Sequence, residues 1–524
     1  MSAEAAPGGR ILFVTSNGTG LGHLTRSMAI ARRLPASLEP FFITFSAGAP
    51  VVRGQGFPVE YVASYDRPGA GNDLSWTFRA RGRLRQCVGE IDPRVVVFDG
   101  THPYERLLPA LRTTGAPLVW CRRAMWRADA DTAPLHRTHL FDHVLEPGEL
   151  DTAADRGPTA ARRGEVTGVD PIVLLDPEDL LDRAGACREL GLDPARRNVL
   201  VQLGQGDGVQ EATRRCLSHL AGVPGVQAAA LSSTLRGLGA TPEAVVRIDA
   251  TYPIARYLAA FDASVAAAGY NVLHELVAMR VPALFVPIER QTDDQAARAN
   301  AAGARGVGVA AKGPDDPALE ALLDELVGAE GQARMRTALA AVAPWNGAEQ
   351  AARWLDGLRS AQRPRVKGSA TYGGANPHST PQAAHRAGPS AGVRLRRAWI
   401  FVSSLPRTLA RIARQVRSRP RLRLEVVALG LDPAEHDRQI IAALERSEEQ
   451  AARTLVITDR LQFGRLLAAG VGIEHIPGQD SPQAALAGEP YEAFRRRRLD
   501  LIRARRPRPK RTITLGFDAD PPVA

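Results

Sequence analysis

The stretch ILFVTSNGTGLGHLTRSMAIARRL fills residues 11–34 of this 524-residue chain. It opens with an apolar run typical of a buried strand and passes through a glycine-rich turn. It ends in a segment whose apolar residues recur with helical spacing. Glycine lets the backbone turn tightly and approach a ligand closely. The stretch therefore predicts a strand, a turn and a helix, the unit from which parallel α/β sheets are built.

Apolar runs separated by helical or loop stretches continue through the first 360 residues. They predict further strands at residues 41–45, 59–63, 95–98, 118–121, 198–203, 226–231, 245–248, 263–267 and 283–286. Such alternation is typical of doubly wound α/β domains, and a chain of this length exceeds one ordinary core. A polar stretch at residues 148–165 separates two similar halves, so we predict two Rossmann-like domains, at residues 1–165 and 166–360.

The remaining residues differ in composition. Residues 361–393 are rich in Gly, Pro, Ser, Ala and His without apolar periodicity, which indicates a flexible linker. Residues 394–524 predict a small α/β module with a basic tail, with strands at 398–403, 424–429 and 454–458 and a helix at 435–444. The arginine run at residues 495–498 fits one solvated helix better than a nucleic-acid site, because no aromatic residues or known reader motif accompany it.

Composition sets broad limits. The chain is 44% hydrophobic and 23% charged, as in soluble globular proteins, and its formal net charge is +11. That charge suits nucleic acid, an anionic membrane or phosphorylated ligands, and does not choose among them. No apolar run is long enough for a membrane span, and the first residues lack a signal-peptide pattern, so we expect a cytoplasmic protein. The cysteines lack metal-type spacing and are expected to be reduced and buried, at positions Cys87, Cys121, Cys187 and Cys216.

The first turn carries the candidate catalytic chemistry. His23 stands where a strand meets a helix, at the crevice where ligands bind in this architecture, and an imidazole suits a general base. The alternative is a histidine that only caps the turn. Arg26 is a candidate for holding a phosphate or carboxylate, or lies on the solvated face of the helix. Together with Arg26, an acceptor or phosphate loop is predicted at Gly18, Thr19, Gly20 and Gly22.

A second candidate, Asp99, ends the predicted strand at residues 95–98 and would face the same crevice. Its carboxylate is suited to orienting an acceptor or acting as an alternative base. The competing interpretation is a structural aspartate in a turn.

The second half supplies candidates for binding a donor. Gly204, Gln205 and Gly206 form another strand-to-helix loop, suited to a phosphate cradle or simply to a tight turn. Farther on, Glu275 is placed to accept hydrogen bonds from both hydroxyls of a ribose; alternatively it is a surface acid. The other donor-side candidates are Gly269, Asn271, Asp294 and Gln295. For Asp294 and its neighbour Asp293, helix capping is the competing interpretation.

In their order along residues 10–358, these motifs resemble the MurG-like glycosyltransferases. The resemblance implies the GT-B fold, with the acceptor on the first domain and a nucleotide sugar on the second. It implies that His23 accepts the proton of the attacking hydroxyl and that Glu275 binds the ribose. The loop at residues 204–208 would hold the diphosphate, and Asp294 and Gln295 the donor sugar. It also implies inversion without a metal or cofactor, and a terminal helix at residues 345–358 that crosses back to the first domain.

The first loop departs from the family pattern. It reads GTGLGH where the named enzyme has GGTGGH, and the loop before Asp294 is longer. The pattern Gly22-His23-x-x-Arg26 also resembles related nucleotide-sugar hydrolases. The leading hypothesis is transfer of a hexose or N-acetylhexosamine from a UDP-sugar to a cell-envelope glycan or lipid-linked acceptor. It includes peripheral association with the anionic inner face of the plasma membrane and no nucleic acid. The alternatives are a nucleotide-sugar hydrolase or epimerase, and a non-catalytic scaffold or regulatory subunit.

Overall fold

A computed structural model describes eleven segments of the chain. They are residues 9–16, 21–66, 73–204, 208–232, 242–249, 251–358, 422–432, 435–447, 454–462, 464–506 and 508–516. Three sheets with only parallel strand pairing lie within these segments. The predicted linker at residues 361–393 and the predicted strand at 398–403 fall outside them.

The first domain is built on a sheet that has seven strands in the described residues, in the order β3-β2-β1-β4-β5-β6-β7. The strands are β1 (Arg10–Thr15), β2 (Glu39–Thr44), β3 (Val59–Tyr61), β4 (Val95–Asp99), β5 (Leu118–Cys121), β6 (His143–Pro147) and β7 (Thr167–Val169). Helices α1 (Gly22–Ala31), α2 (Ala49–Gly54), α3 (Asp73–Ile91) and α4 (Leu108–Leu111) and short 3-10 turns η1 (Ala133–Leu140), η2 (Thr152–Ala154) and η3 (Ala160–Glu165) connect them.

Strand β1 shows why its sequence is apolar throughout. Ile11 and Phe13 pack into the core on one face of the sheet, and Leu12 and Val14 pack into the core on the other. A parallel sheet covered on both faces has no solvent-facing side, so its strands lack polar alternation.

The second domain repeats the arrangement, with strand order β10-β9-β8-β11-β12-β13 in the described residues. Its strands are β8 (Arg197–Gln202), β9 (Val226–Leu231), β10 (Val246–Ile248), β11 (Ala263–Ala267), β12 (Ala283–Val286) and β13 (Val309–Ala310). Its helical elements are η4 (Pro177–Asp179), α5 (Arg183–Leu190), α6 (Val209–Ala221), η5 (Ile254–Ala260), α7 (Tyr270–Ala278), α8 (Gln295–Ala304), α9 (Leu319–Val327) and α10 (Ala329–Ala341). In both sheets the winding reverses beside the first strand, which confirms the predicted pair of doubly wound domains.

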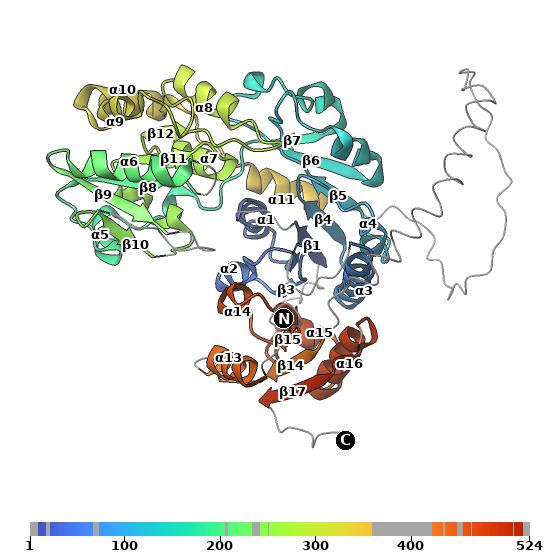
Figure 1. Ribbon diagram of the computed structural model, residues 1–524. Coiled ribbons are helices and arrows are strands. Elements are labelled where there is room, and N and C mark those ends of the chain that lie inside the picture. Colours follow the sequence, from blue (N-terminus) through green and yellow to red (C-terminus); the bar gives the residue numbers. More distant parts are fainter. Residues whose placement is uncertain are drawn as a thin grey trace, which may run out of the picture.

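The boundary between the two domains lies later than predicted. Strand β7 pairs with β6, so the first sheet continues beyond residue 165 to Val169. Helix α11 (Gly347–Gly357) returns from the second domain and packs on α1 and β7, as predicted for the terminal helix (Figure 1). The first domain is therefore completed by a segment from the far end of the second.

The third module contains a parallel sheet with the order β16-β15-β14-β17 among its described residues. Its elements are β14 (Leu424–Leu429), α13 (His436–Ser447), β15 (Thr454–Thr458), α14 (Gly464–Ala468), β16 (Gly472–His475), α15 (Pro482–Leu486), α16 (Tyr491–Ala504) and β17 (Arg511–Gly516). This module lies beside the first domain, next to α2, β3 and α3 (Figure 1). The prediction of a small α/β module in this region is confirmed.

The expected solvated arginine helix is wrong for one of its four arginines. Arg498 on α16 is fully buried and lies 3.1 Å from the buried Glu60 carboxylate of the first domain. Arg83 of α3 lies 2.6 Å from the same carboxylate. Burial opposes the charge of Glu60, but Arg498 and Arg83 outweigh it and lower its pKa to about 2. The run therefore supplies an ion pair that holds the third module on the first domain.

Candidate active site

His23 and Asp99 meet at the carboxyl ends of two neighbouring strands. Asp99 is the last residue of β4, which pairs with β1, and His23 is the second residue of the helix that follows β1. His23 Nδ1 lies 2.6 Å from Asp99 Oδ1, and Asp99 is fully buried. The carboxylate accepts a hydrogen bond from Nδ1–H, so Nε2 is left as the basic nitrogen. The His23 side chain is 16% exposed, which leaves it accessible.

Arg26 lies one helical turn beyond His23 and binds the same carboxylate with two nitrogens of its guanidinium. Its Nε donates to Asp99 Oδ2 at 3.0 Å and its Nη2 to Oδ1 at 2.5 Å. Arg26 is buried, so the alternative that placed it on the solvated face of α1 is wrong. The sequence suggested that Arg26 binds a phosphate or a carboxylate. In the structure it binds the carboxylate of Asp99.

The charges in this triad are set by burial and by the arginine. Burial lowers the pKa of His23 and outweighs Asp99, and the positive charges of Arg26 and Arg123 act in the same direction as burial. For Asp99, burial alone would raise the pKa, but Arg26 and His23 overcome it and the pKa falls. Near neutral pH the triad therefore holds an ionised carboxylate and a neutral imidazole, the state required of a general base.

The second domain contacts α1 directly. Asn271, early in α7, donates its amide to the carbonyl of Gly22 at 3.1 Å. Thr25 Oγ1 lies 2.8 Å from the hydroxyl of Tyr252, which belongs to the second domain. Gly269 caps the start of α7. The predicted residues Gly22, Asn271 and Gly269 therefore lie together with His23 at the junction of the two domains.

Glu275 lies on α7 and carries an unusual carboxylate. It is 9% exposed, and the described residues offer it no hydrogen-bond donor, so the surface-acid alternative is wrong. Burial alone raises the pKa of Glu275 to about 8. Its charge also raises the pKa of Tyr252, so the two side chains are neighbours. A buried carboxylate with unused acceptor capacity is suited to an incoming hydroxyl-bearing ligand.

Asp294 and Gln295 have partners within their own loop. Asp294 Oδ1 accepts from the backbone N–H of Ala297 at 2.9 Å, which confirms helix capping for this residue. Gln295 accepts from the N–H of Ile288 at 3.0 Å and is buried. Asp293 does not cap a helix, because its carboxylate forms ion pairs with two arginines. Both predicted donor-binding residues thus also shape the loop that contains them.

The two glycine-rich loops are described only in part. Gly204 and Gly208 have φ angles of 77° and 71°, a backbone conformation that favours glycine. The predicted residues Gln205 and Gly206 lie outside the described residues, as do Gly18, Thr19 and Gly20.

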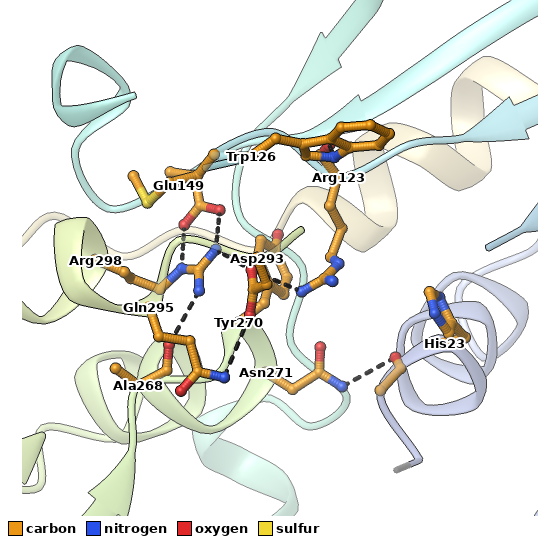
Figure 2. Close-up of polar contacts among 12 residues, drawn as sticks. His23, Arg123, Trp126, Glu149, Ala268, Tyr270, Asn271, Asp293, Gln295 and Arg298 are labelled. Carbon is orange, nitrogen blue, oxygen red and sulfur yellow. Dashed lines mark hydrogen bonds and ion pairs between the residues drawn. The ribbon is translucent and has the colours of Figure 1, made fainter. Parts of the chain in front are cut away.

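Sequence reasoning missed a charged network between the domains (Figure 2). Arg298 on α8 donates to both oxygens of Glu149, which follows β6 in the first domain, at 2.9 and 2.8 Å. Arg298 also bonds Asp293 at 3.0 Å, and Arg123 bonds the same Asp293 oxygen at 3.1 Å. These partners are far apart in sequence, and no local motif marks them. The clearest available signal was the position of Arg123 just after a predicted strand.

The described residues contain no group of three or more His, Cys, Asp or Glu side chains able to hold a metal ion. Among the same residues, every helix is too short or too polar to cross a bilayer. All four cysteines are buried and free, which confirms that prediction.

Two Rossmann-like domains that meet around the carboxyl ends of their strands, with a last helix returning to the first domain, define the GT-B class of glycosyltransferase folds. No protein-family model matches the chain. It is similar to a Clavibacter sepedonicus UDP-N-acetylglucosamine–N-acetylmuramyl-(pentapeptide) pyrophosphoryl-undecaprenol N-acetylglucosamine transferase, at 26% identity over 385 residues, covering 68% of this chain and 99% of the relative. The Mycobacterium bovis transferase of the same name is 29% identical over 353 residues, covering 60% and 81%. The predicted resemblance to the MurG-like transferases is therefore confirmed.

Solved structures that align with the chain include MurG of Acinetobacter baumannii, at 15% identity and a TM-score of 0.44, covering 67% of this chain and all of that one. The spinosyn rhamnosyltransferase SpnG with thymidine diphosphate aligns at 17% identity and a TM-score of 0.43, covering 66% of this chain.

Proposed function

We propose that this chain is a glycosyltransferase that moves a hexose or N-acetylhexosamine from a UDP-sugar to a lipid-linked acceptor of the cell envelope. The observation that carries the proposal is the buried triad of Asp99, Arg26 and His23, on a helix that contacts the second domain, together with the buried Glu275, for which the described residues supply no hydrogen-bond donor. The curated relatives, which are transferases of this kind, support the substrate classes.

In the proposed reaction, Asp99 holds the Nδ1 proton of His23, and Nε2 takes the proton of the acceptor hydroxyl. The acceptor oxygen then attacks the anomeric carbon of the donor sugar. The bond between this carbon and the diphosphate breaks, and UDP leaves with the electron pair. A single displacement of this type inverts the anomeric centre. In this proposal no metal or cofactor takes part, because backbone amides and helix N-termini stabilise the leaving diphosphate.

The donor side follows from Glu275. Its carboxylate would accept hydrogen bonds from the two ribose hydroxyls. These hydroxyls would be the hydrogen-bond donors that the described residues do not provide to Glu275. The loop that begins at Gly204 would cradle the diphosphate. Gly269 and Asn271 at the start of α7, with Asp294 and Gln295, would surround the donor sugar. Gly22, at the start of α1, would border the acceptor.

An exposed apolar patch supports peripheral binding to an anionic membrane on the cytoplasmic side. Leu74 and Phe78 lie one turn apart on α3, and Tyr65 precedes this helix; all three are exposed. Arg81 and Arg85 continue the same helical face beyond Phe78. Apolar side chains bordered by arginine suit insertion between anionic headgroups. A lipid-linked acceptor would meet the enzyme there, and the proposed partners include no nucleic acid.

The deciding experiment screens purified protein against a panel of nucleotide sugars, with and without a lipid-linked acceptor extract. We expect one donor to stabilise the protein against heat and UDP to appear only with acceptor. His23→Ala should abolish UDP release but keep UDP binding, and His139→Ala, which changes an exposed histidine, serves as the control. Absence of binding and turnover across the panel would refute the proposal. UDP release without acceptor would favour a hydrolase. Donor binding without any turnover would favour a non-catalytic scaffold, and turnover that survives both His23→Ala and Glu275→Ala would refute the roles proposed for these two residues.

A further inference from the structure

Two consecutive arginines after β5 have different surroundings. Arg122 is fully buried and directs its Nε and Nη2 to Glu146 of the same domain, at 3.2 and 2.9 Å. Arg123 is 19% exposed and extends to the second domain, where its Nη1 lies 3.1 Å from Asp293 Oδ1 (Figure 2). Arg122 therefore belongs to the framework of the first domain, and Arg123 to the junction.

Burial opposes the charge of Asp293, and the charge of Arg123 lowers the pKa of Asp293 more than the charge of Arg298 does. Asp293 also has partners other than Arg123. Arg298 donates to Asp293 Oδ1 at 3.0 Å, and the Gln295 amide donates to Oδ2 at 3.4 Å. Arg298 is itself fixed by the two oxygens of Glu149 and the carbonyl of Ala268. A buried carboxylate becomes costly when it loses its last partner. Asp293 would keep Arg298 and Gln295 if Arg123 moved away.

Arg123 has donors to spare. A guanidinium carries five N–H donors, and within the described residues the hydrogen bond to Asp293 uses Nη1 alone. Arg298, in contrast, uses all three of its nitrogens. Arg123 is also close enough to His23 that its charge acts on the imidazole. An accessible arginine with unused donors thus stands beside the residue that we take to be the general base.

We propose that Arg123 is a phosphate-binding residue of the substrate site. It pairs with Asp293 through Nη1 and donates its remaining N–H groups to a phosphate of the bound substrate. A guanidinium binds phosphate through two parallel hydrogen bonds. The inference rests on the proposed function, in which the phosphate comes from the donor diphosphate or from a pyrophosphate in the acceptor.

The test compares Arg123→Gln and Arg123→Lys with Arg127→Gln. Arg127 also forms an ion pair across the junction, with Glu289, and so controls for loss of a domain contact. Calorimetry gives the affinities for UDP and for uridine, and steady-state kinetics gives the KM of a pyrophosphate-linked acceptor. If the donor supplies the phosphate, Arg123→Gln weakens UDP roughly 10- to 100-fold and leaves uridine unchanged. If the acceptor does, UDP affinity is kept and the acceptor KM rises by a similar factor. Arg123→Lys should recover only part of the lost affinity, because an ammonium group keeps the charge but cannot form two parallel hydrogen bonds to a phosphate.

Either loss, absent from Arg127→Gln, supports the inference and identifies the source of the phosphate. Equal behaviour of Arg123→Gln and Arg127→Gln in all three measurements would overturn it and leave Arg123 as a contact between domains. In that case the wild type still binds UDP and turns over, so the proposed function stands. A wild type that neither binds UDP nor consumes a UDP-sugar would overturn both. Melting curves of each variant show that the comparison is made on folded protein.

Discussion

The two domains present buried carboxylates to their shared junction in opposite states. Asp99 of the first domain receives two hydrogen bonds from Arg26 and one from His23, and its pKa is lowered. Glu275 of the second domain has no donor among the described residues, and burial raises its pKa to about 8. Both groups lie at the carboxyl ends of parallel strands or on the helices that follow them, where the fold places ligands.

This difference separates catalysis from binding. The first domain compensates its own buried charge, so the proposed base is organised before a substrate arrives. The described residues of the second domain supply no donor to Glu275, and burying a carboxyl group without partners costs stability. Under the proposed function, that carboxylate gains its partners when a ligand with hydroxyl groups binds. The first domain is therefore preorganised. The second domain would be stabilised when a ligand binds.

The largest expected effect comes from removing the charge of Asp99. Asp99→Asn should lower kcat by roughly 10²- to 10⁴-fold, because the amide lacks the negative charge that stabilises protonated His23 and can turn its NH2 toward Nδ1. The affinity for UDP should stay within about threefold, since the proposed donor contacts lie on the other domain. Stopped assays at saturating donor give kcat, and calorimetry gives the affinity. A variant with wild-type kcat would show that the His23–Asp99 contact is structural.

Removing Arg26 tests the other charged partner of Asp99 in the first domain. Arg26→Met leaves the Asp99 carboxylate buried with the imidazole, so the free energy of unfolding should fall by about 3–5 kcal/mol. Arg26 also helps to lower the pKa of His23, so its loss should raise that pKa. Because only neutral His23 accepts a proton, the acidic limb of the kcat profile should move to higher pH. Denaturant titration and a pH series measure the two effects, and an unmoved limb would contradict the electrostatic part.

The second side predicts a pH dependence of binding. Below its pKa of about 8, Glu275 carries a proton in the empty site, and a ribose diol requires the ionised carboxylate. The affinity for UDP should therefore rise with pH, by at most about tenfold per unit, and level off above the pKa. Calorimetry in buffers of different ionisation enthalpy should detect the released proton.

Glu275→Gln supplies the control for that series. The amide cannot titrate, so UDP binding should be weaker and independent of pH. The empty variant should also gain stability over wild type as pH rises from about 5 to 8. The reason is that a raised pKa in the folded state makes wild-type stability decline as pH rises from the unfolded pKa toward the folded one. Parallel pH slopes for wild type and variant would contradict the role of Glu275.

Much of the fold could be predicted from local patterns. The run beginning at Ile11 lies in a strand covered on both faces, which is why it lacks polar alternation. The domain boundary was misplaced because β7 is a three-residue strand of low apolar content, Thr167–Val169. Its place in the first sheet is decided by pairing with β6, and a sequence window does not contain its partner.

In the candidate site too, the residues marked by local sequence patterns could be predicted, and the contacts between distant residues could not. His23 and Asp99 were both identified because each ends a strand or begins a helix at the expected crevice. Their contact, 76 residues apart in sequence, came only with the structure. Arg123 and Arg298 were missed because the partner of each lies in the other domain, and single residues in unlike motifs give no local signal. The burial of Arg498 was not predicted for the same reason, because its partner Glu60 belongs to the first domain.

The smallest predicted effect concerns the bond that joins the two sides. Thr25 Oγ1 and the Tyr252 hydroxyl lie 2.8 Å apart, one on each domain, and Tyr252 neighbours Glu275. Thr25→Val keeps the shape of the side chain and removes the bond, so UDP affinity should fall by roughly two- to tenfold and kcat should hardly change. Tyr252→Phe should match it, and the double variant should lose little more, because both changes delete the same contact. If the losses of UDP affinity in the two single variants add up in the double variant, the two hydroxyls act separately. In that case the contact between α1 and Tyr252 does not affect donor binding.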